Sequence, residues 1–205
     1  MKKKVKKEVK RKKFKDFLGE NYSKSWEYIK ESRNFIWAAV IIFFAAAIIG
    51  FLYQPTFLVN WVMGQMKKAL ADTIGMNTFQ LIFYIFFNNI RAGFGGLIYG
   101  AGFGIITVML SILNGYAVGY ISNSTISAVG AGSLLNLLPH GIFELPAIFI
   151  SFGMGIKFGS FIFYKEKMKN FSKFFVNSMR VFVFVVLPLL IIAAIIEGSL
   201  ISILK

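Results

Sequence analysis

The chain has 205 residues, the length of one ordinary soluble domain, but 57% of them are hydrophobic and 24 are phenylalanine. This composition, with a mean hydropathy of +0.66, is typical of an integral membrane protein and excludes a soluble domain. The formal net charge of +14 is concentrated in the N-terminal residues and in the segment 157–180, which argues against nucleic acid as a partner. The absence of cysteine excludes disulfides and thiolate chemistry.

Residues 1–34 form a basic head. Ten of the first fifteen residues are Lys or Arg, and such a block attracts anionic lipid headgroups by about 1 kcal/mol per basic residue. Further along, apolar residues recur at helical spacing as Phe14, Leu18, Tyr22, Trp26 and Ile29. We therefore predict an amphipathic helix on the cytoplasmic membrane surface, the alternative being a helix packed on a partner. The residues expected at the surface are Lys2, Lys3, Lys4, Lys6, Lys7, Lys10, Arg11, Lys12, Lys13 and Trp26.

Residues 35–205 are predicted to form a transmembrane helical bundle, so the expected fold class is all-α. Apolar stretches long enough to cross the roughly 30 Å hydrocarbon core lie at about 35–53, 73–91, 97–121, 139–164 and 176–196. The segment 56–75 is predicted to be an interfacial helix. The segment 122–138 is too short to cross and is either an outer loop with a short helix or a re-entrant piece. We expect the turn between the second and third spans at Gly93–Gly96, and a basic loop at Lys165–Lys173.

Basic residues in short loops predict the orientation. The N-terminal head and the segment Lys165–Arg180 are rich in Lys and Arg, whereas 122–138 has none. The positive-inside rule therefore predicts a multi-pass protein of the cell membrane, with a cytoplasmic N-terminus and an extracytoplasmic C-terminus. In that orientation Arg91 lies toward the inner side, and Glu144 and Glu197 lie toward the outer surface.

Glycine is concentrated in the middle of the chain, where 14 of the 19 glycines lie between Gly93 and Gly159. Several are spaced by four, namely Gly96, Gly100 and Gly104, then Gly115 with Gly119, and Gly155 with Gly159. Such stripes let helix backbones approach closely. We predict that they pack the third span tightly against the fourth; the alternative is a glycine-lined conduit.

The stretch LPHGIFELPAIFIS places His140 four residues before Glu144, so both lie on one helix face, and Pro139 suits the first helical position. The two side chains could form a structural pair, or an ionisable site for a proton, ion or substrate group. A metal site is a third interpretation, but a catalytic zinc usually has three protein ligands, and a chain with one histidine can barely supply them. No GxSxG motif or second histidine supports nucleophilic catalysis, so we expect neither an enzyme nor a cofactor.

Asparagines occur inside two of the predicted spans. Asn88 and Asn89 lie near the end of the second span, and Asn114 lies well inside the third. Interhelical hydrogen bonds from such amides contribute about 0.6 to 2 kcal/mol. We expect Asn88 and Asn89 to join helices, and Asn114 to belong to a polar cluster with His140 and Glu144.

These motifs resemble those of the stage II sporulation protein M family. The resemblance rests on PHGIFELPAIFIS, on the LNG ending at Gly115 and on the pair Asn88 and Asn89, and it covers about Asn34 to Leu200. The family motif corresponds here to Pro139, His140, Gly141, Glu144 and Pro146. The resemblance implies a polytopic membrane fold. In sporulating bacteria it also implies a component that anchors cell-wall hydrolases during engulfment, with the lytic activity in its partners.

Two functions are consistent with the sequence. The first is a non-enzymatic scaffold or anchor for a membrane-associated complex, forming a homo-oligomer and holding unidentified membrane or extracytoplasmic proteins. The alternative is a transporter or channel subunit whose polar site contains His140, Glu144 and Asn114, with Glu197 as a further candidate. A polar cavity in the centre of the bundle that reaches these side chains favours transport, whereas a dry hydrogen-bonded cluster favours the scaffold.

Overall fold

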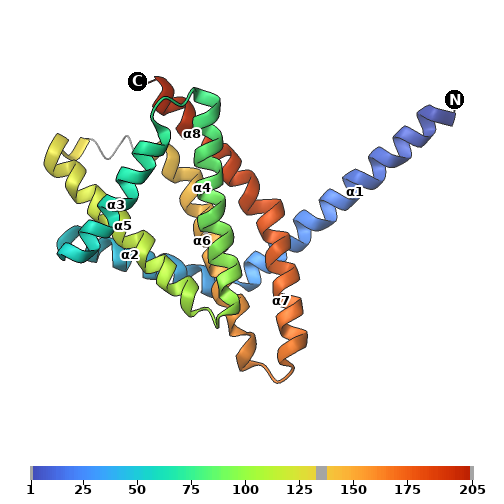
Figure 1. Ribbon diagram of the computed structural model, residues 1–205. Coiled ribbons are helices and arrows are strands. Elements are labelled where there is room, and N and C mark those ends of the chain that lie inside the picture. The colour runs from blue at the N-terminus through green and yellow to red at the C-terminus, as the bar shows by residue number, and fades with distance from the viewer. Residues whose placement is uncertain (1, 133–137, 204–205) are drawn as a thin grey trace.

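The computed structural model describes residues 2–132 and 138–203, and these described residues are almost entirely helical, with no strand. Figure 1 shows α1 projecting from a bundle of the remaining helices. In chain order the elements are α1 (Lys2–Glu31), α2 (Arg33–Leu52), α3 (Thr56–Thr73), α4 (Thr78–Ile98), α5 (Ile105–Val129), α6 (Leu138–Gly159), α7 (Lys167–Val181) and α8 (Leu187–Ile203). Short 3-10 turns follow α4 at Tyr99–Ala101 and α6 at Ser160–Phe163.

Five helical segments are long and apolar enough to cross a membrane, which confirms the predicted all-α membrane fold. They are Arg33–Leu52, Thr78–Ala101, Ile105–Val129, Gly141–Phe163 and Lys167–Ser202. The predicted helix at 56–75 is present as α3, which does not belong to this set. The second span begins later and ends later than expected, at Thr78 and Ala101 instead of 73 and 91.

The turn expected at Gly93–Gly96 is wrong, because these glycines lie inside α4. Their carbonyls accept hydrogen bonds from neighbouring helices: Ser151 Oγ donates to Gly93 O at 2.5 Å, and Thr107 Oγ1 donates to Gly96 O at 2.7 Å. The chain reverses instead around Phe103 and Gly104, both with positive φ. Arg91 therefore lies within α4 and not in an inner loop.

Two further boundaries differ from the sequence prediction. Residues Ser122–Val129 continue α5, so the expected outer loop does not begin at 122, and 133–137 lie outside the described residues. The basic loop expected at Lys165–Lys173 is mostly helix, because α7 begins at Lys167. It runs through a π-helical turn, Phe182–Val186, into α8 without a break. Pro188 follows this turn and cannot donate a backbone hydrogen bond, which explains the local widening of the helix.

The central helix of the bundle is α6, which packs against α2, α4 and α8. Its residues Phe152 and Met154 are fully buried. A Cβ at Gly100 would collide with the backbone of Gly155, and a Cβ at Gly159 would collide with that of Gly104. The stripe from Gly96 to Gly104 therefore does pack against α6, but it belongs to the end of α4 and the following turn, not to the third span.

The pair α2 and α5 is the other closely packed contact. A Cβ at Gly115 would collide with the carbonyl of Phe43, and one at Gly119 with the carbonyl of Ala47. Ser111 Oγ on α5 also donates to the Ala39 carbonyl on α2 at 3.2 Å. Gly115 and Gly119 were expected to face the fourth span, α6. This expectation is wrong, because they face the first span, α2.

This packing predicts opposite effects of alanine at two helical glycines. Gly119→Ala should destabilise the bundle by about 1 to 3 kcal/mol, because overpacking forces α2 away from α5. Gly64→Ala, at an open position of α3, should be neutral or stabilise by up to about 1 kcal/mol through helix propensity. Unfolding temperatures of the purified variants in one detergent measure both effects. Equal unfolding temperatures for Gly119→Ala and wild type would contradict the α2–α5 contact.

Candidate functional site

Two adjoining hollows lie along one side of the bundle and are open to the outside, and α3 forms one wall of both. The first, of about 870 Å³, lies between α3, α4 and α5. We call it the basic hollow; its polar lining residues are Gln65, Lys68, Asp72, Tyr84, Asn88, Arg91 and Asn114. The second, of about 590 Å³, lies between α3, α4, α6 and α8. We call it the acidic hollow; its polar lining residues are Thr73, Tyr84, Asn88, Asn89, Glu144 and Glu197. Tyr84 and Asn88 line both, so the hollows are neighbours.

The wall formed by α3 is loosely held. The structure describes all of α3, and only Val62 of this helix is buried, against Tyr116 and Tyr120 of α5. Near its other end, the Tyr84 hydroxyl of α4 donates to Asp72 Oδ2 at 3.3 Å. These contacts hold α3 beside polar side chains of the spanning helices, of which Tyr84 and Asn114 are half-buried and Asn88 and Arg91 are exposed. The helix forms despite its weak packing because its interior contains no proline, and Pro55 precedes its first residue.

The polar lining reaches the middle of the spanning helices. Arg91 lies 13 residues after Thr78 and 10 before Ala101, which at about 1.5 Å per residue is about 20 Å and 15 Å from the two ends of that span. Asn88 lies one turn from Arg91, and Asn114 lies 9 residues into α5. The basic hollow therefore brings charge and amide groups to the depth of the hydrocarbon centre.

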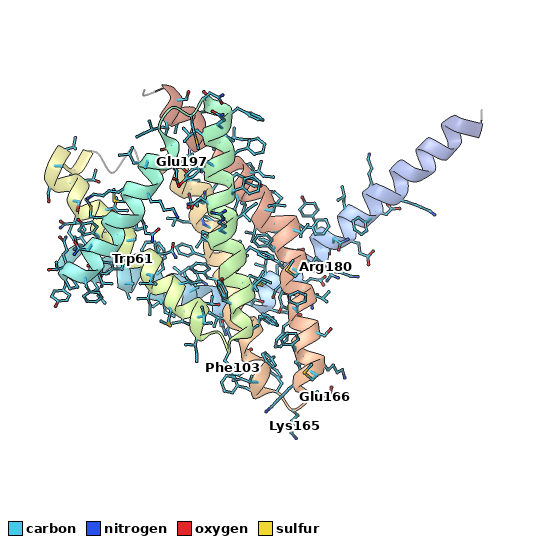
Figure 2. The ribbon with its side chains drawn as sticks, in the orientation of Figure 1. Trp61, Phe103, Lys165, Glu166, Arg180 and Glu197 are labelled. Atoms are coloured by element: carbon cyan, nitrogen blue, oxygen red, sulfur yellow. The ribbon has the colours of Figure 1, made fainter. Side chains whose placement is uncertain are left out.

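The acidic hollow lies toward the end of the bundle where the chain terminates. Glu144 lies near the start of α6, and Figure 2 shows Glu197 near the C-terminus, opposite the turn that contains Lys165 and Glu166. Asn89 is only 4% exposed, and its Nδ2 has no hydrogen-bond partner among the described residues. A buried amide donor left unsatisfied costs about 1 to 3 kcal/mol. This amide therefore marks a place where water or a ligand group would be held.

The structure does not bring the described members of the predicted polar cluster, Asn114 and Glu144, into one hollow. Glu144, Asn88 and Asn89 line the acidic hollow, while Asn114 lines the basic hollow and donates to the Leu110 carbonyl of its own helix at 2.8 Å. Asn88 and Asn89 were expected to join helices, but their side chains line cavities instead. The side chains of Pro139 and His140 lie outside the described residues. In the rest of the motif, Gly141 is half-buried and Pro146 is exposed within α6.

A second polar site, which the sequence analysis did not single out, surrounds Lys157 of α6. Its side chain is 8% exposed, and Nζ donates to Ser32 Oγ at 2.9 Å and lies 3.5 Å from Glu31 Oε2. Nζ also lies 3.9 Å from the ring centre of Tyr28, a cation–π contact. We call Tyr28, Glu31, Ser32 and Lys157 the lysine junction. The sequence signal was a lysine at the end of an apolar, glycine-rich run, and it did not indicate which helix supplies the partners.

The lysine junction attaches α1 to the bundle. Ser25, Tyr28 and Ser32 form the buried face, and Arg180 Nε of α7 donates to Asn21 Oδ1 at 3.1 Å. Burial raises the pKa of the Tyr28 hydroxyl, so it stays protonated. Of the predicted apolar face, Ile29 packs against the core and the Tyr22 ring lies 5.7 Å from the Phe184 ring, whereas Trp26 remains 56% exposed. One face of α1 thus packs on the bundle of the same chain, and the exposed flank with Trp26 remains free to contact lipid.

Removing one hydroxyl tests the lysine junction. Ser32→Ala deprives the buried Lys157 ammonium of an acceptor, and hydrogen bonds to charged groups contribute about 1.5 to 3 kcal/mol. We expect earlier proteolytic cleavage of α1 and a lower unfolding temperature. Ser172→Ala, at an exposed position of α7, is the matched control and should behave as wild type. If both variants keep the wild-type cleavage rate, the junction does not hold α1.

The site geometry defines a class of protein: a polytopic helical membrane protein with polar hollows at mid-span. Among the side chains that the structure describes, which do not include that of His140, no group of three His, Cys, Asp or Glu could hold a metal ion. The family model for stage II sporulation protein M matches residues 28–200, and the chain belongs to this family. Comparisons with curated proteins and with solved structures found no match. The matched region contains all four residues of the lysine junction and every lining residue of the two hollows except Ile201.

Proposed function

We propose that the protein is a transporter or channel subunit that passes a small polar or charged solute through the two hollows. One observation supports this most strongly: polar and ionisable side chains line adjoining cavities from mid-span to one end of an otherwise apolar bundle. Of the two functions consistent with the sequence, transport is the one that such a cavity favours. The proposed activity is non-enzymatic.

Polar groups at the middle of a spanning helix carry an energetic cost. An Arg or Asp at the centre of a spanning helix disfavours membrane insertion by about 2.5 to 3.5 kcal/mol. Arg91 and Asn88 nevertheless lie near mid-span, where transporters commonly place their substrate sites. The weakly packed α3 also covers the hollows from one side, so its movement would open them without disrupting the core around α6.

The proposal gives the hollows different roles. Glu144 and Glu197 provide carboxylates at one end, which suit a cation or a proton. Asn88 and Tyr84 line the boundary between the hollows and can exchange hydrogen bonds with a passing solute. Arg91 lies beyond them at mid-span.

Glu144→Gln tests the acidic hollow, because it keeps the side-chain shape and removes the charge. The assay uses pyranine-loaded proteoliposomes under an imposed pH gradient. We expect the wild-type protein to conduct protons and the Glu144→Gln variant to conduct them at least about tenfold more slowly, because the charge that binds the ion is lost. Glu166→Gln, in the exposed turn before α7, is the matched control and should retain flux. Wild-type liposomes no more permeable than empty ones to protons, Na⁺ and K⁺, or an unaffected Glu144→Gln variant, would refute this role.

A second candidate function, a scaffold for a membrane-associated complex, is favoured by the projecting helices. The segment Lys167–Ser202 has 36 residues, so it is about 54 Å long and exceeds the roughly 30 Å hydrocarbon core. Its α7 end and α1 are held together by Arg180 and Asn21. These two helices present exposed apolar side chains such as Phe17 and Met168, which suit protein partners or further copies of the chain.

The basic head is expected to bind anionic lipid in either function. Deleting residues 2–13 removes most of the N-terminal charge, and each basic residue contributes about 1 kcal/mol near an anionic surface. Protein in neutral nanodiscs should therefore co-sediment with phosphatidylserine vesicles more than about tenfold better than the deletion variant at low salt. The difference should disappear near 1 M salt, where the Debye length is only about 3 Å and the charges of the head are screened. A deletion without effect at low salt would sink this role of the head.

A further inference from the structure

We infer that the basic hollow binds an amphipathic anion, a phosphate or carboxylate group on an apolar body, with the Arg91 guanidinium as its counter-charge. This inference rests on the proposed function and names the class of solute for the basic hollow alone; the acidic hollow keeps its proposed role for a cation or a proton. It depends on the charges of the hollow, on the geometry of the donors and on the nature of the remaining wall.

The charge balance of the basic hollow favours an anion. Lys68 of α3 and Arg91 of α4 are cationic, and Asp72 is the one carboxylate of the lining. The Tyr84 hydroxyl already donates to Asp72. Among the described residues, Arg91 forms neither a hydrogen bond nor an ion pair. A cation at mid-span without a counter-charge is unfavourable in hydrocarbon, and a bound anion would neutralise it.

The donors suit an oxyanion. A guanidinium presents paired N–H groups whose spacing matches the two oxygens of a carboxylate or phosphate. Gln65 of α3 and Asn88 of α4 add neutral amide donors from two sides of the same hollow. Glu144 and Glu197 lie in the other hollow and would repel an anion that moved past Asn88.

The rest of the wall suits an apolar body. Apolar lining residues include Trp61 on α3, Phe87 on α4, and Leu110, Leu113 and Ile121 on α5. Trp61 and Phe87 are partly exposed at the rim, and Figure 2 shows Trp61 on the α3 side of the bundle. The volume of about 870 Å³ falls within the range of sites for organic ligands, about 300 to 1,000 Å³. An inorganic anion would leave this apolar wall uncovered.

Equilibrium binding of phenyl phosphate to the full chain in phosphatidylcholine nanodiscs tests the inference, with phenol as the uncharged probe. We expect wild type to bind phenyl phosphate and not phenol. Arg91→Gln should weaken binding by at least about tenfold, and Arg91→Lys, which keeps the charge, by about threefold or less. Lys68→Gln, on the exposed surface of α3, should weaken binding by about threefold. Arg33→Gln, outside both hollows, is the matched control and should bind as wild type.

The same assay in nanodiscs that contain phosphatidylglycerol distinguishes the source of the anion. If phosphatidylglycerol competes with phenyl phosphate and the competition requires Arg91, the ligand is a lipid headgroup. If phosphatidylglycerol does not compete, the ligand is a soluble organic anion. Both outcomes support an anion site at Arg91. Equal phenyl phosphate binding by wild type and a folded Arg91→Gln variant overturns the inference. If Arg91→Gln does not fold, equal binding by Lys68→Gln and wild type overturns it. A wild type that binds neither phenyl phosphate nor phosphatidylglycerol also overturns it.

Failure of this inference and failure of the proposed function give different results. Arg91-dependent binding without any flux refutes transport and leaves the anion site intact. Proton flux that depends on Glu144, without Arg91-dependent binding, refutes the anion site alone.

Discussion

Hydrocarbon cannot solvate a polar group, and the organisation of this bundle follows from that constraint. Hydroxyls inside the bundle donate to carbonyls of neighbouring helices, as Ser151 does to Gly93 and Thr107 does to Gly96. Glycine makes this possible, because α4 and α6 approach so closely at Gly100 and Gly155 that no Cβ fits. Other polar side chains, among them Asn88 and Arg91, line the hollows beside α3.

The central helix α6 connects the two polar sites. Glu144 lies in the acidic hollow near its start, and Lys157 lies in the lysine junction near its end. These residues are 13 positions apart, or about 20 Å along the helix. The hollows and the projecting pair α1 and α7 are thus attached to one buried, closely packed element. This arrangement makes transport and scaffolding compatible in one protein, because a change at the hollows and a change at the projection would both act on α6.

Much of the fold follows from the sequence, and the misses have identifiable causes. Apolar length predicted the five spans, because the hydrocarbon core sets that length. The segment Gly93–Gly96 was misread as a turn because glycine suits both turns and close helix packing, and only the partner helix decides between them. Glu144, Asn88 and Asn89 were recognised as polar residues in spans, but their shared hollow depends on helix rotation. Lys157 was missed because its partners, at the end of α1 and at Ser32 directly after this helix, are about 125 residues away in the sequence.

A path for a solute through the two hollows requires that water reach the polar residues in the middle of the bundle. The chain has no cysteine, so single cysteines can be introduced and labelled in native membranes. Asn88→Cys, which lines both hollows, should react with a water-soluble, membrane-impermeant methanethiosulfonate reagent. Phe83→Cys, exposed on α4 and outside both hollows, should not react because it faces lipid. Labelling at position 88 that is no faster than at position 83 would contradict a water-filled polar path through the bundle.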